Sequence, residues 1–313
     1  MIERKLTIVN INNLRDFEEK AINFINTINK NYIINDDGFL YFPDKHIAIS
    51  LNEKYESSNL YKPKDYFTNI TNTYRDKGIR LMNLFDWRID HEDSWNKIKM
   101  LLITAIGNPK KIMSRKCEVR QITNNEAKPL NEKFHTMGHR NAKVTYGVFF
   151  QNQLVEIMSF SVSKWNRNIK SDNEWEIIRG CAGSINATIL DNDPDSLYFV
   201  AGGPTRLMTH FIRDYNPDVI FSYCEKDLFG GNSYLAAGMH FVGNTGETKW
   251  WLCDEIDPET GKMGLIIPRN PARYKELKVR SNNQIIWTCG SDRYVWIKPG
   301  YQYQGKGQEF LNV

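Results

Sequence analysis

The chain has 313 residues, 41% of them hydrophobic, and its 41 Lys and Arg against 37 Asp and Glu leave a formal net charge of +4. Such a length allows two domains with separate cores, and so small a net charge does not by itself predict a nucleic-acid partner. No apolar run approaches the ~18 residues of a membrane span, and the charged N-terminus is unlike a secretory signal, so we expect a cytoplasmic protein with no membrane partner.

Five cysteines are present, and none of them forms a CxxC pair. Because they stand in apolar or strand-like surroundings, we expect reduced structural thiols rather than disulfides. Zinc ligation by cysteine is not expected for the same reason.

Residues 1–110 have the pattern of a small α/β domain. The turn Pro43-Asp44-Lys45 separates two strands, and Gly78 ends a helix. Apolar residues at helical or alternating spacing predict helices at 14–28, 67–77 and 95–106, and strands at 38–42, 46–51 and 79–85.

The segments FLYFPDKHIAISLN and YRDKGIRLMNLFDWRI carry a resemblance within this domain. They resemble the very-short-patch-repair-like branch of the PD-(D/E)XK nucleases, a module of phage proteins. Those nucleases hold a divalent ion on acidic residues of two adjacent strands, but the matching positions here are Phe39 and Ser50. The resemblance therefore implies an inactive nuclease fold without a metal, kept for DNA docking or packing. A different acidic site, from Asp36, Asp37, Asp44 and Glu53, stays open.

Residues 111–173 are locally basic. The stretch 115–170 has ten Lys or Arg against four Asp or Glu. The latter part of the basic segment KKIMSRKCEVRQI is predicted to be a strand. A helix is predicted at 126–134, and a hairpin of strands at 144–150 and 154–160. A mixture of cationic and aromatic side chains suits phosphate contact and base stacking, whereas a solvated surface explains the charge equally well. The candidate nucleic-acid-binding residues are His135, Arg140, Lys164, Trp165 and Arg167.

The stretch from Trp175 to Val242 is a strand, glycine turn, helix, strand, helix, strand unit, which is an α/β pattern. Strands are predicted at 175–181, 197–201 and 219–224. Gly202 and Gly203 open a helix whose free N–H groups are suited to an anion. A plain tight turn explains the same two glycines.

The segments WEIIRGC, AGGPTRLMTHFI, VIFSYCEKD and GGNSYLAAGMHF together resemble the core of the GNAT acyltransferases. They are more similar to a GNAT-like domain of phage proteins and to Mom-type DNA-modification enzymes. The resemblance implies an acyl-coenzyme A or related donor on Gly202, Gly203 and Thr205, with Tyr234 as general acid. It also places His135 in a His-x-x-Gly motif. The sequence departs from the family at Phe199, where Gln or Arg is usual, and at Pro204, where a small residue is usual.

Two charged residues complete the candidate site. Glu225 follows a predicted strand at the end where a GNAT site opens, so it is a candidate general base, with a salt bridge as the alternative. Arg179 is a candidate for binding an anionic donor or phosphate, with a surface ion pair as the alternative.

We therefore expect an α/β (α+β) protein with a nuclease-like domain at 1–110, a GNAT-like mixed-sheet domain at 111–245 and a β-rich extension at 246–313. The predicted function is group transfer to nucleobases of DNA, in the cytoplasm of a bacterial host cell. One alternative is a DNA-binding protein without catalysis, derived from a homing-type endonuclease. Another is an acyl-CoA-dependent N-acyltransferase for a protein or a small amine. The oligomeric state is not predicted.

Overall fold

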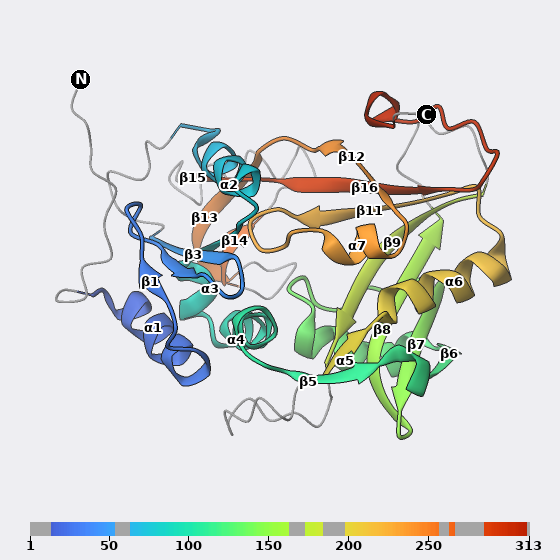
Figure 1. The fold of residues 1–313 in the computed structure, drawn as a ribbon, viewed down its shortest axis with the longest axis horizontal. Helices are drawn as coiled ribbons and strands as arrows, with labels where there is room; N and C mark the ends of the chain where they lie inside the picture. Colours follow the sequence, from blue (N-terminus) through green and yellow to red (C-terminus); the bar gives the residue numbers. More distant parts are fainter. Residues whose placement is uncertain are drawn as a thin grey trace. The chain divides into compact units, whose positions relative to one another are not determined.

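The computed structural model describes residues 14–53, 63–162, 173–183, 198–256, 263–266 and 285–311. The chain forms two compact units, each assembled from separate segments and coloured along the sequence in Figure 1. Unit 1 comprises 1–95, 225–229 and 245–291, and unit 2 comprises 96–224, 230–244 and 292–313. The boundaries of these units differ from the domain limits that we expected near residues 110 and 245.

Unit 1 contains a four-stranded sheet in the order β1-β2-β3-β4. The first two pairings are antiparallel, whereas β3 and β4 are parallel. A second, antiparallel sheet has the order β14-β13-β15. The elements are α1 (Asp16–Ile28), β1 (Ile33–Ile34), β2 (Leu40–Phe42), β3 (Ile47–Asn52), α2 (Tyr66–Asp76), β4 (Arg80–Phe85), α3 (Asp86–Asp90), the start of α4 (Glu92–Ile106), β13 (Thr248–Ile256), β14 (Met263–Ile266) and β15 (Ile285–Thr288).

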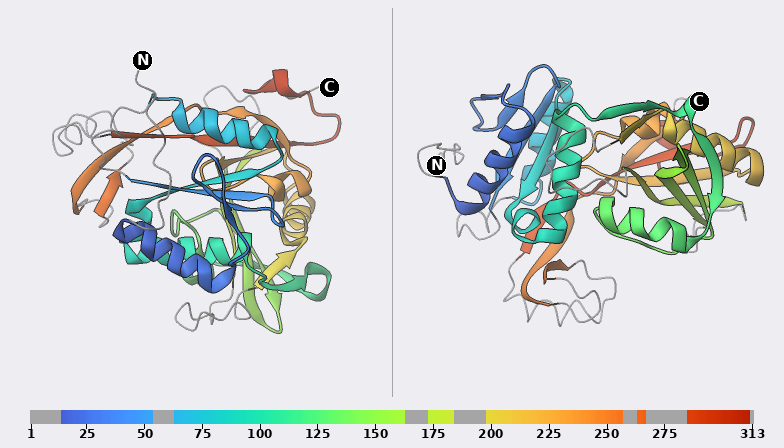
Figure 2. Two further views of the ribbon diagram at one scale, coloured as in Figure 1. Left: turned by 60° about the vertical axis from the view of Figure 1, so that its left-hand side comes forward. Right: turned by 90° about the horizontal axis from the view of Figure 1, so that it is seen from below.

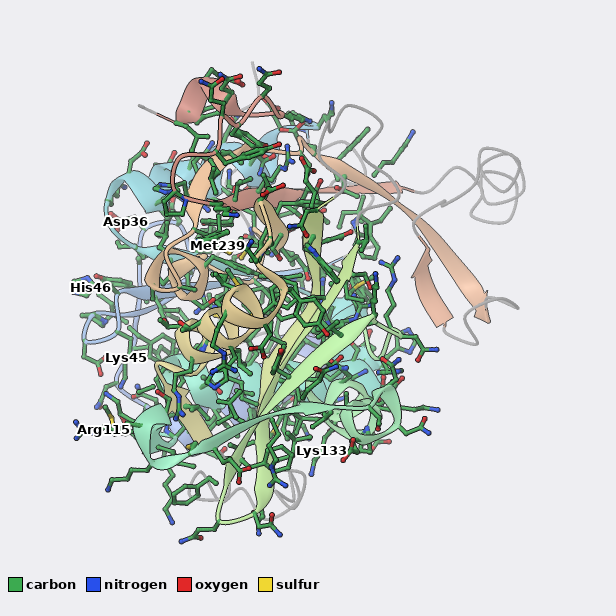
Figure 3. The ribbon with its side chains drawn as sticks, turned by 90° about the vertical axis from the view of Figure 1, so that its right-hand side faces the viewer. Asp36, Lys45, His46, Arg115, Lys133 and Met239 are labelled. Atoms are coloured by element: carbon green, nitrogen blue, oxygen red, sulfur yellow. The ribbon has the colours of Figure 1, made fainter. Side chains whose placement is uncertain are left out.

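The burial of unit 1 follows the apolar pattern of its sequence. All six residues of β3, a central strand between β2 and β4, are buried, as expected for a strand that is covered on both faces. The predicted turn after β2 is present, and its last residue, His46, takes a left-handed φ of 51°; Figure 3 labels it beside Lys45. The helix α1 buries Phe17, Ala21 and Ile25.

Unit 2 is organised around a seven-stranded mixed sheet in the order β12-β16-β11-β9-β8-β7-β6. Strands β6 to β9 are antiparallel neighbours, and β11 pairs with β9 in parallel. A separate parallel pair joins β5 and β10. The elements are β5 (Lys110–Met113), β6 (Glu118–Ile122), α5 (Asn124–Phe134), β7 (Val144–Phe150), β8 (Gln153–Val162), β9 (Glu174–Ala182), β10 (Tyr198–Ala201), α6 (Gly203–Tyr215), β11 (Val219–Glu225), α7 (Asn232–Ala236), β12 (His240–Asn244) and β16 (Ser291–Ile297).

The helices α5 and α6 cover opposite faces of this sheet (Figure 2, right). On one face Phe211 of α6 stacks on Phe160 of β8, with ring centroids 3.7 Å apart. On the other face Ala127 and Leu130 of α5 pack on Ile157. Since side chains alternate along a strand, Phe160 and Ile157 of β8 lie on opposite faces and meet different helices.

Two features differ from the arrangement expected along the sequence. The predicted strand 197–201 is β10, which pairs with β5 rather than with the main sheet. The segment after 245 is divided, because 245–291 belongs to unit 1 while β16 lies in the main sheet between β12 and β11. The hydrophobic periodicity identifies strands but not their partners.

The fold class is mixed α/β, as the sequence predicted. Among the residues that the structure describes, none of the helices has the length and apolarity needed to cross a membrane.

Candidate active site

Strands β9 and β11 of unit 2 run side by side only at their beginnings. The parallel ladder joins Val219–Phe221 to Glu174–Glu176, whereas β11 continues to Glu225 and β9 to Ala182. One side-chain bond follows the ladder, from Ser222 Oγ to the carbonyl oxygen of Ile177 at 3.2 Å. The two strands therefore diverge after their first three residues.

Tyr234 lies where the strands diverge. Its hydroxyl lies 3.1 Å from Ser222 Oγ, at hydrogen-bond distance, and its ring stacks on Tyr294 with centroids 5.1 Å apart. Burial, followed by the charge of Cys224, raises the pKa of Tyr234 to about 12. The phenol is therefore protonated at neutral pH and is a possible proton donor.

A glycine at position 231 makes this arrangement possible. Gly231 has a left-handed φ of 75°, and a Cβ at this position would be 1.8 Å from Tyr294 Oη. A side chain at position 231 would therefore displace the ring on which Tyr234 stacks. The glycine directly before α7 is explained by this packing.

Arg179 and His135 lie together near the start of the loop after α5. The Nε of Arg179 donates to the carbonyl oxygen of Gly138 at 2.7 Å, and His135 Nδ1 accepts from the Met137 N–H at 3.1 Å. Burial, then Arg179 and Lys97, lowers the pKa of His135 to about 3. The imidazole is therefore neutral and carries its proton on Nε2, which leaves that atom as a donor.

Glu176 is a residue of this region that sequence reasoning did not single out. It is opposite Ser161 on β8, and Arg179 is opposite Ser159, with Ile178 as the extra residue of a β-bulge. In a regular strand, residues three apart face opposite sides, but this bulge brings Glu176 and Arg179 to the same face. Burial raises the pKa of Glu176, while Arg140 and Arg179 lower it.

The remaining predicted nucleic-acid-binding residues fall in two groups. Arg140 is exposed and lies close enough to Glu176 to act on its ionisation. Lys164, Trp165 and Arg167 lie outside the described residues. The structure thus brings three of the predicted residues, His135, Arg140 and Arg179, to one region of unit 2.

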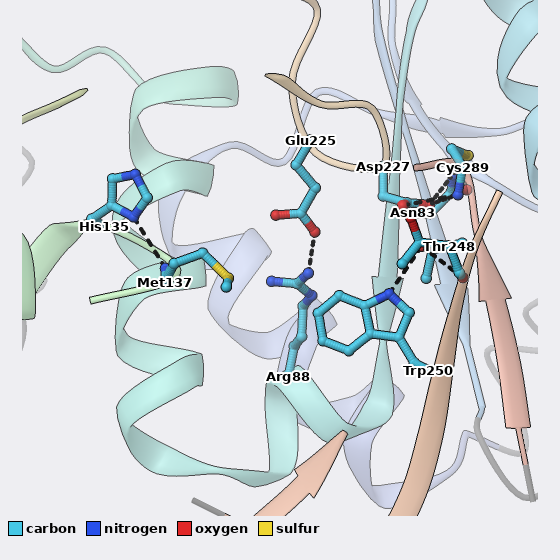
Figure 4. A network of polar contacts seen from close by, with 10 residues as sticks. Asn83, Arg88, His135, Met137, Glu225, Asp227, Thr248, Trp250 and Cys289 are labelled. Carbon is cyan, nitrogen blue, oxygen red and sulfur yellow. Dashed lines mark hydrogen bonds and ion pairs between the residues drawn. The ribbon is translucent and has the colours of Figure 1, made fainter. Parts of the chain in front are cut away.

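Glu225 has a different environment, within unit 1. Its carboxylate forms an ion pair with Arg88 of α3, as Figure 4 shows. The next two residues also form hydrogen bonds within unit 1. Lys226 Nζ donates to Asn72 Oδ1, and the Asp227 carboxylate accepts from the backbone N–H of Cys289 at 3.1 Å. This arrangement corresponds to the salt-bridge alternative for Glu225.

The glycine turn before α6 has the conformation that the sequence predicts. Gly202 is the N-cap of α6 in the left-handed region, with a φ of 76°, and Pro204 lies in the first turn. The hydroxyl of Thr205 donates to the carbonyl oxygen of Ala236 at 3.0 Å. However, the carboxylate of Glu156 on β8 fills the space beside Gly203, where a Cβ would be 1.5 Å from its Oε2.

This turn does not fit the diphosphate of coenzyme A as it stands. A diphosphate needs several N–H donors and no carboxylate beside them. Pro204 has no N–H, the Arg206 N–H bonds to the Gly202 carbonyl oxygen at 3.1 Å, and Glu156 lies against Gly203.

The positions matched to the nuclease metal site have structural roles in unit 1. Phe39 is buried and packs on Tyr74, and Ser50 Oγ donates to Asn83 Oδ1 at 2.8 Å. Of the open acidic alternatives, Asp37 accepts from the Tyr74 hydroxyl at 2.5 Å. Within the described parts of the chain, His, Cys, Asp and Glu form no group that could hold a metal ion.

Comparison with known proteins gives little beyond these observations. No protein-family model matches the chain, and no curated protein matches it. The chain is distantly similar to a structure of N-acetylglutamate synthase from Neisseria gonorrhoeae complexed with coenzyme A and N-acetyl-glutamate, with 12% identity and a TM-score of 0.26. That alignment covers 80% of this chain and 51% of the synthase, so the chain spans about half of its length. At this TM-score the likeness carries no argument, and the site is interpreted from its own geometry.

Proposed function

We propose that unit 2 is a GNAT-like group transferase whose active site is the opening between β9 and β11. The observation that carries the proposal is the divergence of these strands after Glu176 and Phe221, with the Tyr234 phenol beside Ser222 at that point. Strands that diverge direct main-chain N–H and C=O groups into the space between them. An extended ligand can pair with such groups as an added strand.

Tyr234 and Glu176 have complementary protonation behaviour for group transfer. In the proposed reaction an acceptor amine attacks an activated carbonyl carbon, the bond to the leaving group breaks, and the amine loses a proton. Tyr234 donates a proton to the leaving group, and Glu176 accepts the proton of the amine. Burial raises the pKa of Glu176, which strengthens it as a proton acceptor, while the cationic neighbours Arg140 and Arg179 act in the opposite direction.

The acceptor in this proposal is an exocyclic amine of a DNA base. Supporting observations are the grouping of His135, Arg140 and Arg179 and the basic composition of the stretch 115–170, to which His135 and Arg140 belong. Cationic side chains contact phosphates, and a neutral imidazole N–H donates to a base edge or a phosphate. A base inside a duplex must be flipped out or be single-stranded before it reacts.

Replacing Arg140 by Ala should weaken DNA binding about three- to tenfold and reduce the salt dependence by roughly one phosphate contact. Fluorescence anisotropy with single-stranded and duplex DNA at several salt concentrations measures both quantities. Arg213→Ala is the matched control, because the Arg213 side chain is 64% exposed on α6 and is paired with Asp214. An equal loss of DNA affinity in both variants, or no DNA affinity in the unmodified protein, would contradict DNA as the acceptor.

Glu176→Gln and Glu225→Gln should have opposite effects. Loss of the base at position 176 lowers kcat by about 10²-fold with little change in stability. Loss of the Glu225 charge leaves Arg88 without its carboxylate and lowers the melting temperature, with kcat nearly unchanged. Single-turnover kinetics and thermal unfolding of the same preparations separate the two, and the reverse result would assign the base to Glu225.

A further inference from the structure

The N-terminus of α6 is faced by a buried carboxylate from the sheet beneath it. Glu156 lies on β8 four residues before Phe160, on the face that α6 covers, and only 6% of its surface is exposed. Its Oε2 atom is buried and has no hydrogen-bond partner. Such an atom is costly in a folded protein, so its position calls for an explanation.

The carboxylate occupies the space that a side chain at position 203 would need. A Cβ built on Gly203 would lie 1.5 Å from Glu156 Oε2 and 2.5 Å from its Cδ. Gly202 is also approached from its Cβ side, with Ser114 Oγ 3.0 Å from a Cβ there. The space beside both glycines of the turn is therefore occupied by side chains of this protein, Ser114 beside Gly202 and Glu156 beside Gly203.

The surrounding charges do not draw Glu156 away from the turn. The nearby guanidinium of Arg206 bonds to the carbonyl oxygens of Ser114 and Cys117. Burial raises the pKa of Glu156 to about 8. The partial positive charge of the helix N-terminus is the favourable electrostatic partner that remains for its ionised form.

We infer that Glu156 closes the α6 turn and excludes a diphosphate from it, so that the donor of the proposed transferase is an activated acyl-type group not held here by a nucleotide diphosphate. A diphosphate on these N–H groups would have to displace the Glu156 carboxyl and would be repelled by its ionised form. The inference rests on the proposed function where it names the donor. The exclusion itself concerns binding alone.

Isothermal titration of the full chain with coenzyme A, and separately with inorganic pyrophosphate, tests the exclusion. The unmodified protein should bind neither ligand at millimolar concentration, and Glu156→Ala should bind both at least tenfold more tightly. Micromolar binding of coenzyme A by the unmodified protein would overturn the inference. Equal absence of binding in both proteins would also overturn it, because Glu156 would then not be the barrier.

Two further variants keep the test decisive. If Glu156→Ala does not fold, Glu156→Ser leaves similar space and takes its place. Gly203→Ala should lower the melting temperature because its methyl group meets the carboxylate, and Glu156→Ala in the same chain should restore it. No restoration would show that the carboxylate does not lie against this turn. Since these measurements need no turnover, they are independent of whether Tyr234 supports group transfer.

Discussion

Replacing Tyr234 by Phe is expected to lower the rate of group transfer by about 10²-fold or more, because the change removes the proton donor of the reaction. The ring remains, so its stacking on Tyr294 and the fold of α7 are retained. Nucleic-acid affinity should stay within about twofold of the unmodified value. Rate measurements with saturating acceptor, combined with binding titrations, check both parts.

Ser222→Ala is the control for this variant. It removes the hydroxyl that donates to the carbonyl oxygen of Ile177 and lies within hydrogen-bond distance of the Tyr234 hydroxyl, but it leaves the phenol in place. A rate loss of about tenfold, smaller than that of Tyr234→Phe, is expected for a residue that orients the proton donor. If Tyr234→Phe retains the full rate, the acid must be another group.

Replacing Asp227 by Ala should destabilise unit 1 by about 3 kcal/mol, the largest stability effect that we expect. Asp227 is 2% exposed, and its carboxylate accepts from the Cys289 N–H and from Asn83 Nδ2 (Figure 4). The Ala variant leaves both donors buried without this acceptor. Denaturant unfolding measures the loss, and an unchanged midpoint would contradict the assigned role.

The contribution of Asp227 to the free energy of unfolding should decrease as the pH rises. Burial, followed by the charge of Glu225, raises the pKa of Asp227 from 3.8 to about 6. An acid whose pKa is higher in the folded state gives stability that is present below its unfolded pKa and is lost as the pH rises to the folded value. Asp227→Asn cannot ionise, so its stability relative to the unmodified protein should rise between about pH 4 and pH 6 and then level off. A flat difference over this window would contradict the shift.

Much of the local structure is predictable from the sequence because it depends on short-range patterns. Residues 46–51 are mostly apolar and follow a turn, and β3 forms there. Gly202 and Pro204 predict a helix start, and α6 begins at Gly203. The glycines before Tyr234 predict the turn that precedes α7.

The residues that matter most to the interpretation of the site depend on long-range features. Glu176 joins Arg179 only because of a bulge at Ile178, which the sequence does not reveal. Glu156 meets Gly203 because α6 packs over β8, two elements separated by about 50 residues. Glu225 is the last residue of β11, but it forms its ion pair with Arg88 of unit 1 because the short segment 225–229 belongs to that unit. Strand pairing and insertion are set by tertiary packing, which local periodicity does not encode.

Nucleoside mass spectrometry of DNA from cells that produce the chain tests the central proposal most directly. Total DNA is digested to nucleosides and compared between the unmodified protein, Tyr234→Phe and an empty vector. A new nucleoside with the unmodified protein alone is the expected result, and its mass identifies the transferred group. The same nucleoside at equal abundance with Tyr234→Phe would contradict DNA group transfer at this site. So would the absence of a new nucleoside both in these cells and in DNA incubated with the purified protein and an extract of the native host as donor source.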